Sequence, residues 1–188
     1  MTPTEILSDE HRQIVQVLDC LEEAAGRLDD GDNIDADFFL AAAEFVKGFA
    51  DGCHHRKEED ILFVAMTAND MPQDGGPVAV MLHEHDLGRQ YTQGFQSAAE
   101  RMKDGDAAAA SDVVQNVFDY VGLLREHIVK EDMVLFPMAE QLITGHELQN
   151  LSREFERVVA EDKAQGESAR YQALAQKLLV ALDRETVG

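Results

Sequence analysis

One pattern of histidines and glutamates occurs twice in the first 140 residues. In each copy, a Glu-His pair is followed 42 or 43 residues later by His-x-x-x-Glu-x-x-x-x-Phe. The first copy contains Glu10, His11, His54, Glu58 and Phe63, and the second contains Glu84, His85, His127, Glu131 and Phe136. Residues four apart project from one face of a helix. Each copy is therefore expected to fold as a helical hairpin, with a single His on the first helix and a His/Glu pair on the second.

The rest of the sequence is also helical in pattern. Apolar residues recur at helical spacing, and the alternating β-branched runs typical of strands are few. Helices are expected at about 2–28, 37–67, 78–103, 107–143, 144–163 and 167–184, with Pro137 kinking or shortening the fourth. Two hairpins form a four-helix bundle. The prediction is an all-α fold with an up-down-up-down four-helix bundle over residues 1–146 and a two-helix C-terminal extension over residues 147–188.

Charge changes at the same boundary. Residues 1–146 hold 29 acidic and 10 basic side chains, residues 147–188 hold 8 and 6, and the whole chain has a formal net charge of -21. A protein with this negative charge repels phosphate backbones and anionic membranes. Neither nucleic acid nor a membrane is therefore an expected partner. No apolar run could span a bilayer, the N-terminus does not resemble a signal peptide, and the two cysteines form no disulfide framework. A cytoplasmic location is therefore expected.

Both His/Glu pairs lie on apolar helix faces, His54 and Glu58 between Ala50 and Leu62. Burying a carboxylate costs several kcal/mol unless it is paired, hydrogen-bonded or bound to a metal. Because those faces carry no Lys or Arg, a metal site is the simplest compensation, and imidazole with carboxylate suits iron, manganese or zinc. Six ligands from four helices suit two ions bridged by the two glutamates. The predicted ligands are His11, His54, Glu58, His85, His127 and Glu131.

Several neighbouring residues are assigned weaker roles. His83 and His85 lie about 200° apart on their helix, and His85 is preferred because its stripe is more apolar and because it matches the first copy of the repeat. His55 is turned about 100° from His54 and is expected to flank the site. Tyr120 is expected to pack in the core. Glu59, Asp60 and Asp132 are expected on solvated helix faces, and Cys53 as a small buried hydrophobe.

The pattern H…HxxxE…H…HxxxE resembles the hemerythrin HHE cation-binding family of bacterial type. The strings HRKEEDILF (55–63) and HIVKEDMVLFPMAE (127–140) look like that family's second and fourth helices, and the resemblance covers about residues 5–142. It implies an up-down-up-down bundle with a non-haem di-iron centre that binds O2 or related small oxidants, and it places the ligands on the same six residues. Oxygen-carrying members have a further His on the third helix, where this chain has Met81 and Arg89.

The expected function is the binding or sensing of O2, NO or peroxide at a His4Glu2 centre holding two iron ions, with manganese or zinc as alternatives. These small molecules are expected to enter past Gly88 and Thr92, the smallest residues of the third helix's inner stripe. The alternatives are an enzyme for peroxide disproportionation or NO reduction, iron donation or iron–sulfur repair, and a scaffold that binds a partner through its C-terminal helices. The ligands alone do not separate these functions, and the oligomeric state stays open.

Overall fold

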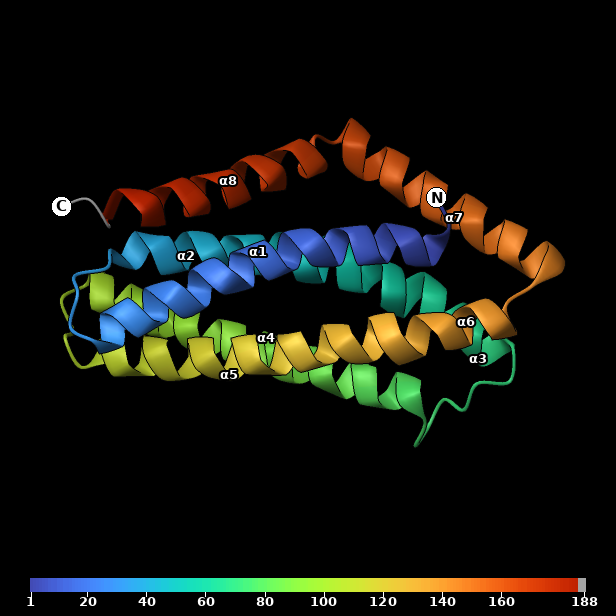
Figure 1. Cartoon of the computed structure of the whole chain (residues 1–188), viewed down its shortest axis with the longest axis horizontal. Helices are drawn as coiled ribbons and strands as arrows, with labels where there is room; N and C mark the ends of the chain where they lie inside the picture. Colours follow the sequence, from blue (N-terminus) through green and yellow to red (C-terminus); the bar gives the residue numbers. More distant parts are fainter. Residues whose placement is uncertain (186–188) are drawn as a thin grey trace.

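A computed structural model describes the backbone of residues 1–185 and the side chains of residues 1–182 (Figure 1). The helices are α1 (Pro3–Asp29), α2 (Ala36–Phe45), α3 (Phe63–Ala68), α4 (Pro77–Lys103), α5 (Ala109–Lys130), α6 (Phe136–Leu142), α7 (Gly145–Ala164) and α8 (Glu167–Glu185). Three π-helical segments join them: η1 (Val46–His55), η2 (Glu58–Leu62) and η3 (Glu131–Leu135). Within residues 1–185 there is no strand. The all-α class is confirmed.

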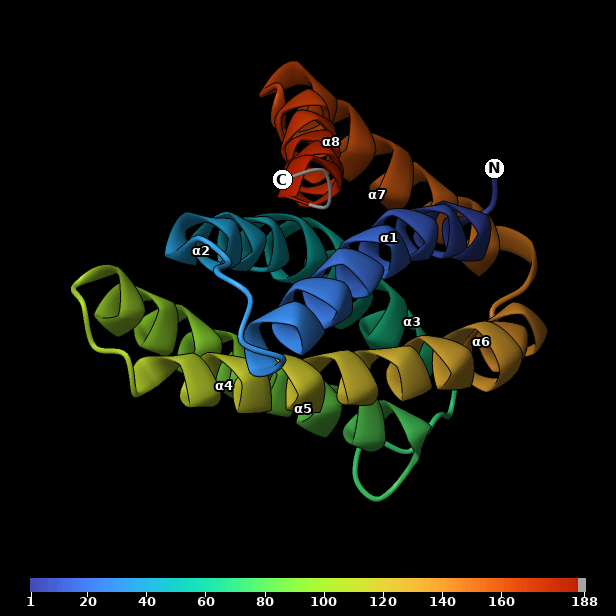
Figure 2. The ribbon, with the colours of Figure 1, turned by 60° about the vertical axis from the view of Figure 1, so that its left-hand side comes forward.

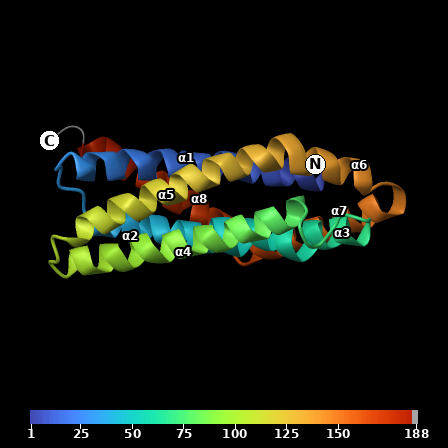
Figure 3. The same cartoon turned by 90° about the horizontal axis from the view of Figure 1, so that it is seen from below.

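These elements form long rods that lie side by side (Figures 1 and 3). One rod is α1, the second runs from α2 through η1 and η2 into α3, the third is α4, and the fourth runs from α5 through η3 into α6. Consecutive rods run in opposite directions, so each loop lies at an end of the bundle. Every rod therefore passes through the middle of the bundle, where side chains from all of them can meet.

The first helix begins with a capping box formed by Thr2 and Glu5. The Thr2 hydroxyl accepts a hydrogen bond from the Glu5 amide at 3.2 Å, the Glu5 carboxylate accepts one from the Thr2 amide at 2.8 Å, and Pro3 occupies the first turn. Thr144 and Glu147 have the spacing of a second capping box, but the structure does not form one. Thr144 precedes α7 with extended backbone, but its side chain makes no capping hydrogen bond.

The two His-x-x-x-Glu-x-x-x-x-Phe motifs share a backbone feature that their spacing does not reveal. The amide of Phe63 donates to the carbonyl of Glu58, and the amide of Phe136 donates to that of Glu131, so each bond spans five residues instead of four. Each ligand glutamate thus opens a π turn that the phenylalanine closes, a deviation frequent at functional sites. Pro137 follows in the first turn of α6, where its missing N–H is tolerated.

Two apolar clusters fill the interior on either side of a layer of buried His and Glu. Leu7, Leu62 and Leu135 belong to one cluster, whereas Ala50 and Leu124 belong to the other. Both clusters include residues of the C-terminal helices, because α7 and α8 lie along α1 and α2 (Figure 2). The division at residue 146 stays a prediction. None of the described helices is long and apolar enough to cross a membrane.

Candidate metal centre

The six predicted ligands meet in the polar layer between the two apolar clusters. They come from all four rods: His11 from α1, His54 and Glu58 from η1 and η2, His85 from α4, and His127 and Glu131 from α5 and η3. Each has at most 2 % of its surface exposed. His83, the rejected alternative to His85, is exposed on the outside of α4.

The metal-binding atoms of this layer, including those of His55, form two adjacent groups that share the carboxylate of Glu58. One group contains His11, His54, Glu58 and Glu131, and the other contains His55, Glu58, His85 and His127; within each group the atoms lie within 4.8 Å of one another. Glu131 also reaches both groups, because Oε2 lies 3.2 Å from His11 Nε2 and Oε1 lies 3.2 Å from His127 Nε2. This donor set would fit two cations, with Glu58 and Glu131 available to both.

Unpartnered atoms mark the centre of the layer. In the described part of the chain, six buried side-chain polar atoms have no hydrogen-bond partner, and five of them belong to Glu58, Glu131 and His11. Buried carboxylate oxygens without partners are costly. In addition, His85 Nε2 and His127 Nε2 lie 3.1 Å apart. Lone pairs of five groups thus converge on one small volume, which is the requirement of a metal site.

The pKa values of the two central glutamates, Glu58 and Glu131, are shifted in opposite directions. Burial and the negative charge of Glu131 hold the pKa of Glu58 well above its usual range. Burial would also raise the pKa of Glu131, but the imidazoles of His11 and His127 hold it at about 2. Without metal, the two carboxylates therefore titrate as a coupled pair in which Glu58 is the more readily protonated member.

A second layer of carboxylates orients the imidazoles. Every predicted His ligand has its Nδ1 close to one carboxylate oxygen: His54 to Glu10 at 3.0 Å, His127 to Glu84 at 2.9 Å, His11 to Asp132 at 3.0 Å and His85 to Glu59 at 2.7 Å. A carboxylate at Nδ1 fixes the ring tautomer and turns the Nε2 lone pair toward the metal. The prediction of a solvated face is therefore wrong for Glu59 and Asp132, whereas Asp60 is exposed.

These orienting contacts follow the repeat. The glutamate before the first-helix His binds the His of its own hairpin's second helix, as Glu10 does for His54. The acid after the ligand glutamate binds the first-helix His of the other hairpin, as Asp132 does for His11. The duplicated Glu-His pair and the duplicated acid after each ligand glutamate were visible in the sequence. The roles of these acidic residues could not be predicted from the sequence, because the imidazoles that they contact lie on other helices.

His55 belongs to the site, so the prediction that it flanks the site is wrong. Only 5 % of its surface is exposed, its ring stacks on that of His85 with centroids 3.8 Å apart, and its Nδ1 lies 3.4 Å from Asp51 Oδ1. The cause is η1: the Arg56 amide donates to the Asp51 carbonyl five residues back. A π turn holds an extra residue, so consecutive side chains diverge less than in an α-helix, and His54 and His55 both face inward.

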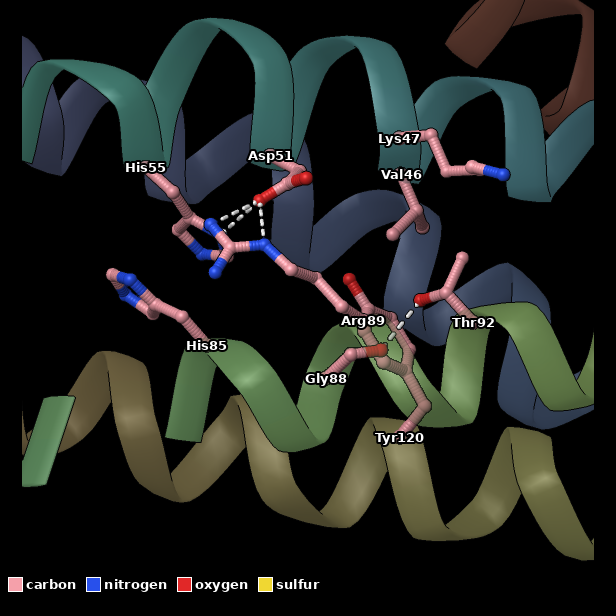
Figure 4. Close-up of a pocket in the computed structure, with 9 residues that line it drawn as sticks. All are labelled: Val46, Lys47, Asp51, His55, His85, Gly88, Arg89, Thr92 and Tyr120. Carbon is pink, nitrogen blue, oxygen red and sulfur yellow. Dashed lines mark hydrogen bonds and ion pairs between the residues drawn. The ribbon is translucent and has the colours of Figure 1, made fainter. Parts of the chain in front are cut away.

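A small pocket of about 50 Å³ opens beside the second group (Figure 4). Its lining residues are Val46, Lys47, Asp51, His55, His85, Gly88, Arg89, Thr92 and Tyr120. Gly88 and Thr92, the predicted route of access, are thus part of it. Arg89 donates to Asp51 at 2.8 Å and to Glu59 at 2.6 Å, so it joins the two carboxylates that contact His55 and His85.

Comparisons with known proteins agree with the geometry. The model of the hemerythrin HHE cation binding domain matches residues 2–139. Uncharacterized protein Rv1995 of Mycobacterium tuberculosis is 24% identical over 156 residues, which cover 83% of this chain and 60% of the relative. The iron-sulfur cluster repair protein YtfE of Dickeya chrysanthemi is 34% identical over 88 residues, which cover 46% of this chain and 40% of the relative.

The matched regions therefore span 60% or less of these relatives' own length. No solved structure matches the chain. The family model, in contrast, covers most of the sequence, and its range contains every residue of the buried His/Glu layer. The chain belongs to the hemerythrin HHE cation-binding family.

Proposed function

We propose that the protein is a non-haem di-iron protein that binds or senses O2 or a related small oxidant, NO or peroxide. The observation that carries this proposal is the set of unpartnered donor atoms of Glu58, Glu131 and His11 at the middle of the bundle. His11, His54, Glu58, His85, His127 and Glu131 would hold the two ions, with His55 as a further ligand of the second. The donor set also suits manganese or zinc.

Iron would supply a change of oxidation state and coordination positions for a small ligand. The protein's own residues supply the surroundings. Glu10, Glu59, Glu84 and Asp132 fix the imidazoles, as their contacts with Nδ1 indicate. The apolar clusters on both sides exclude bulk water, and the small pocket beside His55 and His85 limits access to molecules of a few atoms.

We further propose residues 1–146 as the metal-binding unit, an up-down-up-down hemerythrin-like bundle, and residues 147–188 as an extension whose helices α7 and α8 pack on it. A cytoplasmic location follows from the composition argument and is part of the same proposal. Iron donation or iron–sulfur repair is the second candidate function. It is favoured by the 34% identity with the iron-sulfur cluster repair protein of Dickeya chrysanthemi over 88 residues.

Metal analysis combined with optical spectra under N2, air, NO and H2O2 tests the proposal. We expect two iron ions per chain and a spectrum that changes on exposure to O2 or NO and returns when the gas is removed. Steady O2 evolution from H2O2 would instead indicate an enzyme, and rapid transfer of iron to a chelator or an apo iron–sulfur protein would indicate iron donation. A preparation that binds one ion or none would contradict the proposed centre.

A further inference from the structure

One unpartnered polar atom is not explained by the metal site. Of the six buried side-chain atoms without hydrogen-bond partners in the described chain, five are metal-directed, and the sixth is Tyr120 Oη. Tyr120 is 1 % exposed and packs edge to face on Phe95 with ring centroids 6.0 Å apart. Packing explains the ring. It does not explain a buried hydroxyl, since phenylalanine would fill the same space without the cost of an unpaired polar group.

The hydroxyl lies in the pocket that adjoins the metal centre. Figure 4 shows the Tyr120 side chain extending from α5 past the α4 backbone at Gly88, with its oxygen at the far end, toward η1. A Cβ at Gly88 would lie 3.7 Å from Tyr120 Cε2 and 3.4 Å from Leu124 Cδ2, so alanine would fit there in ordinary van der Waals contact. Larger side chains would enter the pocket.

Other polar groups on the pocket wall are already engaged. The Thr92 hydroxyl donates to the Gly88 carbonyl at 2.8 Å, and Arg89 donates to Asp51, Asp86 and Glu59. Lys47 donates to Gln96 at 3.0 Å. Among the pocket-lining residues, the O–H of Tyr120 is therefore the donor left without an acceptor. Burial also raises the pKa of its phenol, which keeps the proton in place as a donor.

We propose that Tyr120 is the residue that positions the small ligand: a molecule in this pocket lies between the second ligand group and Tyr120 and accepts a hydrogen bond from its hydroxyl. This inference rests on the proposed function. A pocket of about 50 Å³ has room for a diatomic or triatomic molecule, because one water needs about 10–15 Å³ on this scale. Tyr120 would thus favour ligands whose outer atom carries negative charge or a lone pair.

Tyr120→Phe in the iron-loaded full chain tests the proposal, with azide and NO as probes. We expect unchanged iron content and azide binding that is weaker by roughly tenfold to hundredfold, the effect of losing a hydrogen bond to a charged acceptor. The infrared stretch of bound azide should shift between H2O and D2O in the parent protein and no longer shift in Tyr120→Phe. A general loss of packing would not remove this isotope shift selectively.

Tyr91→Phe is the matched control, since Tyr91 lies on α4 but does not line the pocket, and it should bind both probes like the parent. Gly88→Leu should block both probes, whereas Gly88→Ala should not.

In the metal-free protein, Tyr120→Phe should not lower the unfolding temperature. Unchanged azide affinity with a persisting isotope shift would overturn the role of Tyr120 alone. A parent protein that binds iron but neither probe would overturn the proposed function, and this inference with it.

Discussion

The two hairpins of the repeat orient their ligands by equivalent contacts but differ in their surroundings. In the first hairpin, Lys57 donates to Glu10, and in the second, Lys130 donates to Glu84; each lysine lies three residues after the His that its partner orients. Lys57 is 1 % exposed, whereas the Lys130 side chain is 41 % exposed. The same ion pair is thus part of the core in one hairpin and close to the surface in the other.

The C-terminal helices account for this difference, because α7 and α8 pack mainly against α1, α2, η1 and η2 of the first hairpin. Arg56 donates to Asp162 of α7 at 2.9 Å, and the Cys53 thiol donates to Glu167 of α8 at 3.4 Å. Tyr171 of α8 packs so closely on Gly48 that a Cβ there would lie 2.0 Å from its hydroxyl oxygen. The extension therefore buries the outer side of the rod that carries His54, His55 and Glu58.

The inner faces differ as well. His55 and Asp51 of the first hairpin correspond to Ile128 and Leu124 of the second, because each pair holds the same place relative to His54 or His127. The first hairpin thus adds an imidazole to the centre, and the two candidate ion positions are unequal. A duplicated sequence provides two similar half-sites, and a few substitutions in one copy make them different.

The largest expected effect is common to both hairpins. Glu58→Ala should reduce bound iron from two ions per chain to fewer than one, because Glu58 belongs to both ligand groups. Glu131→Ala should do the same. Iron and protein quantified after desalting give the measurement. Glu126→Ala, which removes an exposed carboxylate from α5, is the control and should keep both ions. A full iron complement in Glu58→Ala would contradict the shared carboxylate.

The next effect should separate the hairpins. Glu10→Gln leaves Lys57 buried without its counter-charge, which should destabilise the metal-free protein by about 3 kcal/mol. Glu84→Gln leaves a half-exposed lysine, and the loss there should be at most about 1 kcal/mol. Urea unfolding of the two variants gives the comparison. Equal losses would mean that the extension does not bury the first hairpin more deeply.

Stability of the metal-free protein should be greatest near pH 6.5. Burial lowers the pKa of His11, but the carboxylates of Asp132 and Glu131 outweigh it and raise the value to about 9. That stabilisation is complete below about pH 6.5 and is lost progressively as pH rises to about 9, a change on the order of 3 kcal/mol. Burial lowers the pKa of His54 and His85, so stability should also fall below about pH 6.5.

Urea titrations from pH 5.5 to 9.5 check both limbs of this profile. In His11→Gln the decline above about pH 6.5 should become shallower while the acid limb remains, because Glu58, whose pKa is also raised, still contributes. An unchanged decline in His11→Gln would assign the alkaline limb to another group.

The smallest effect should come from making the hairpins alike. His55→Ile copies the residue of the second hairpin and should weaken the binding of one of two metal ions by about tenfold, the lower end of the cost of a lost ligand-shell contact. A stepwise titration with Zn²⁺ or Fe²⁺ resolves the two ions. His83→Ile, a change on the exposed face of α4, should leave both steps unchanged. Weakening of both ions together would show that His55 supports the layer as a whole.

The sequence alone predicted the helical class, the repeat and the six residues that gather in the polar layer. Local geometry is the reason: His54 and Glu58 are four residues apart, and a helix places such residues on one face whatever its neighbours are. Flanking apolar residues then indicate which face is buried. Choosing His85 over His83 depended on the same reasoning, and the structure places His85 inside and His83 outside.

Only the tertiary structure decided which residues contact each other across helices and where the backbone departs from α-helical geometry. The contact of Asp132 with His11 joins residues 121 positions apart, and no spacing rule reaches that far. His55 turns inward because a hydrogen bond in η1 spans five residues. A prediction from α-helical periodicity assumes bonds that span four residues, so it places His55 on the wrong face. The pocket and the position of the Tyr120 hydroxyl depend on how α5 packs against α4 beside Gly88. Periodicity fixes the face a residue lies on, whereas its partners are decided by how the helices pack against each other.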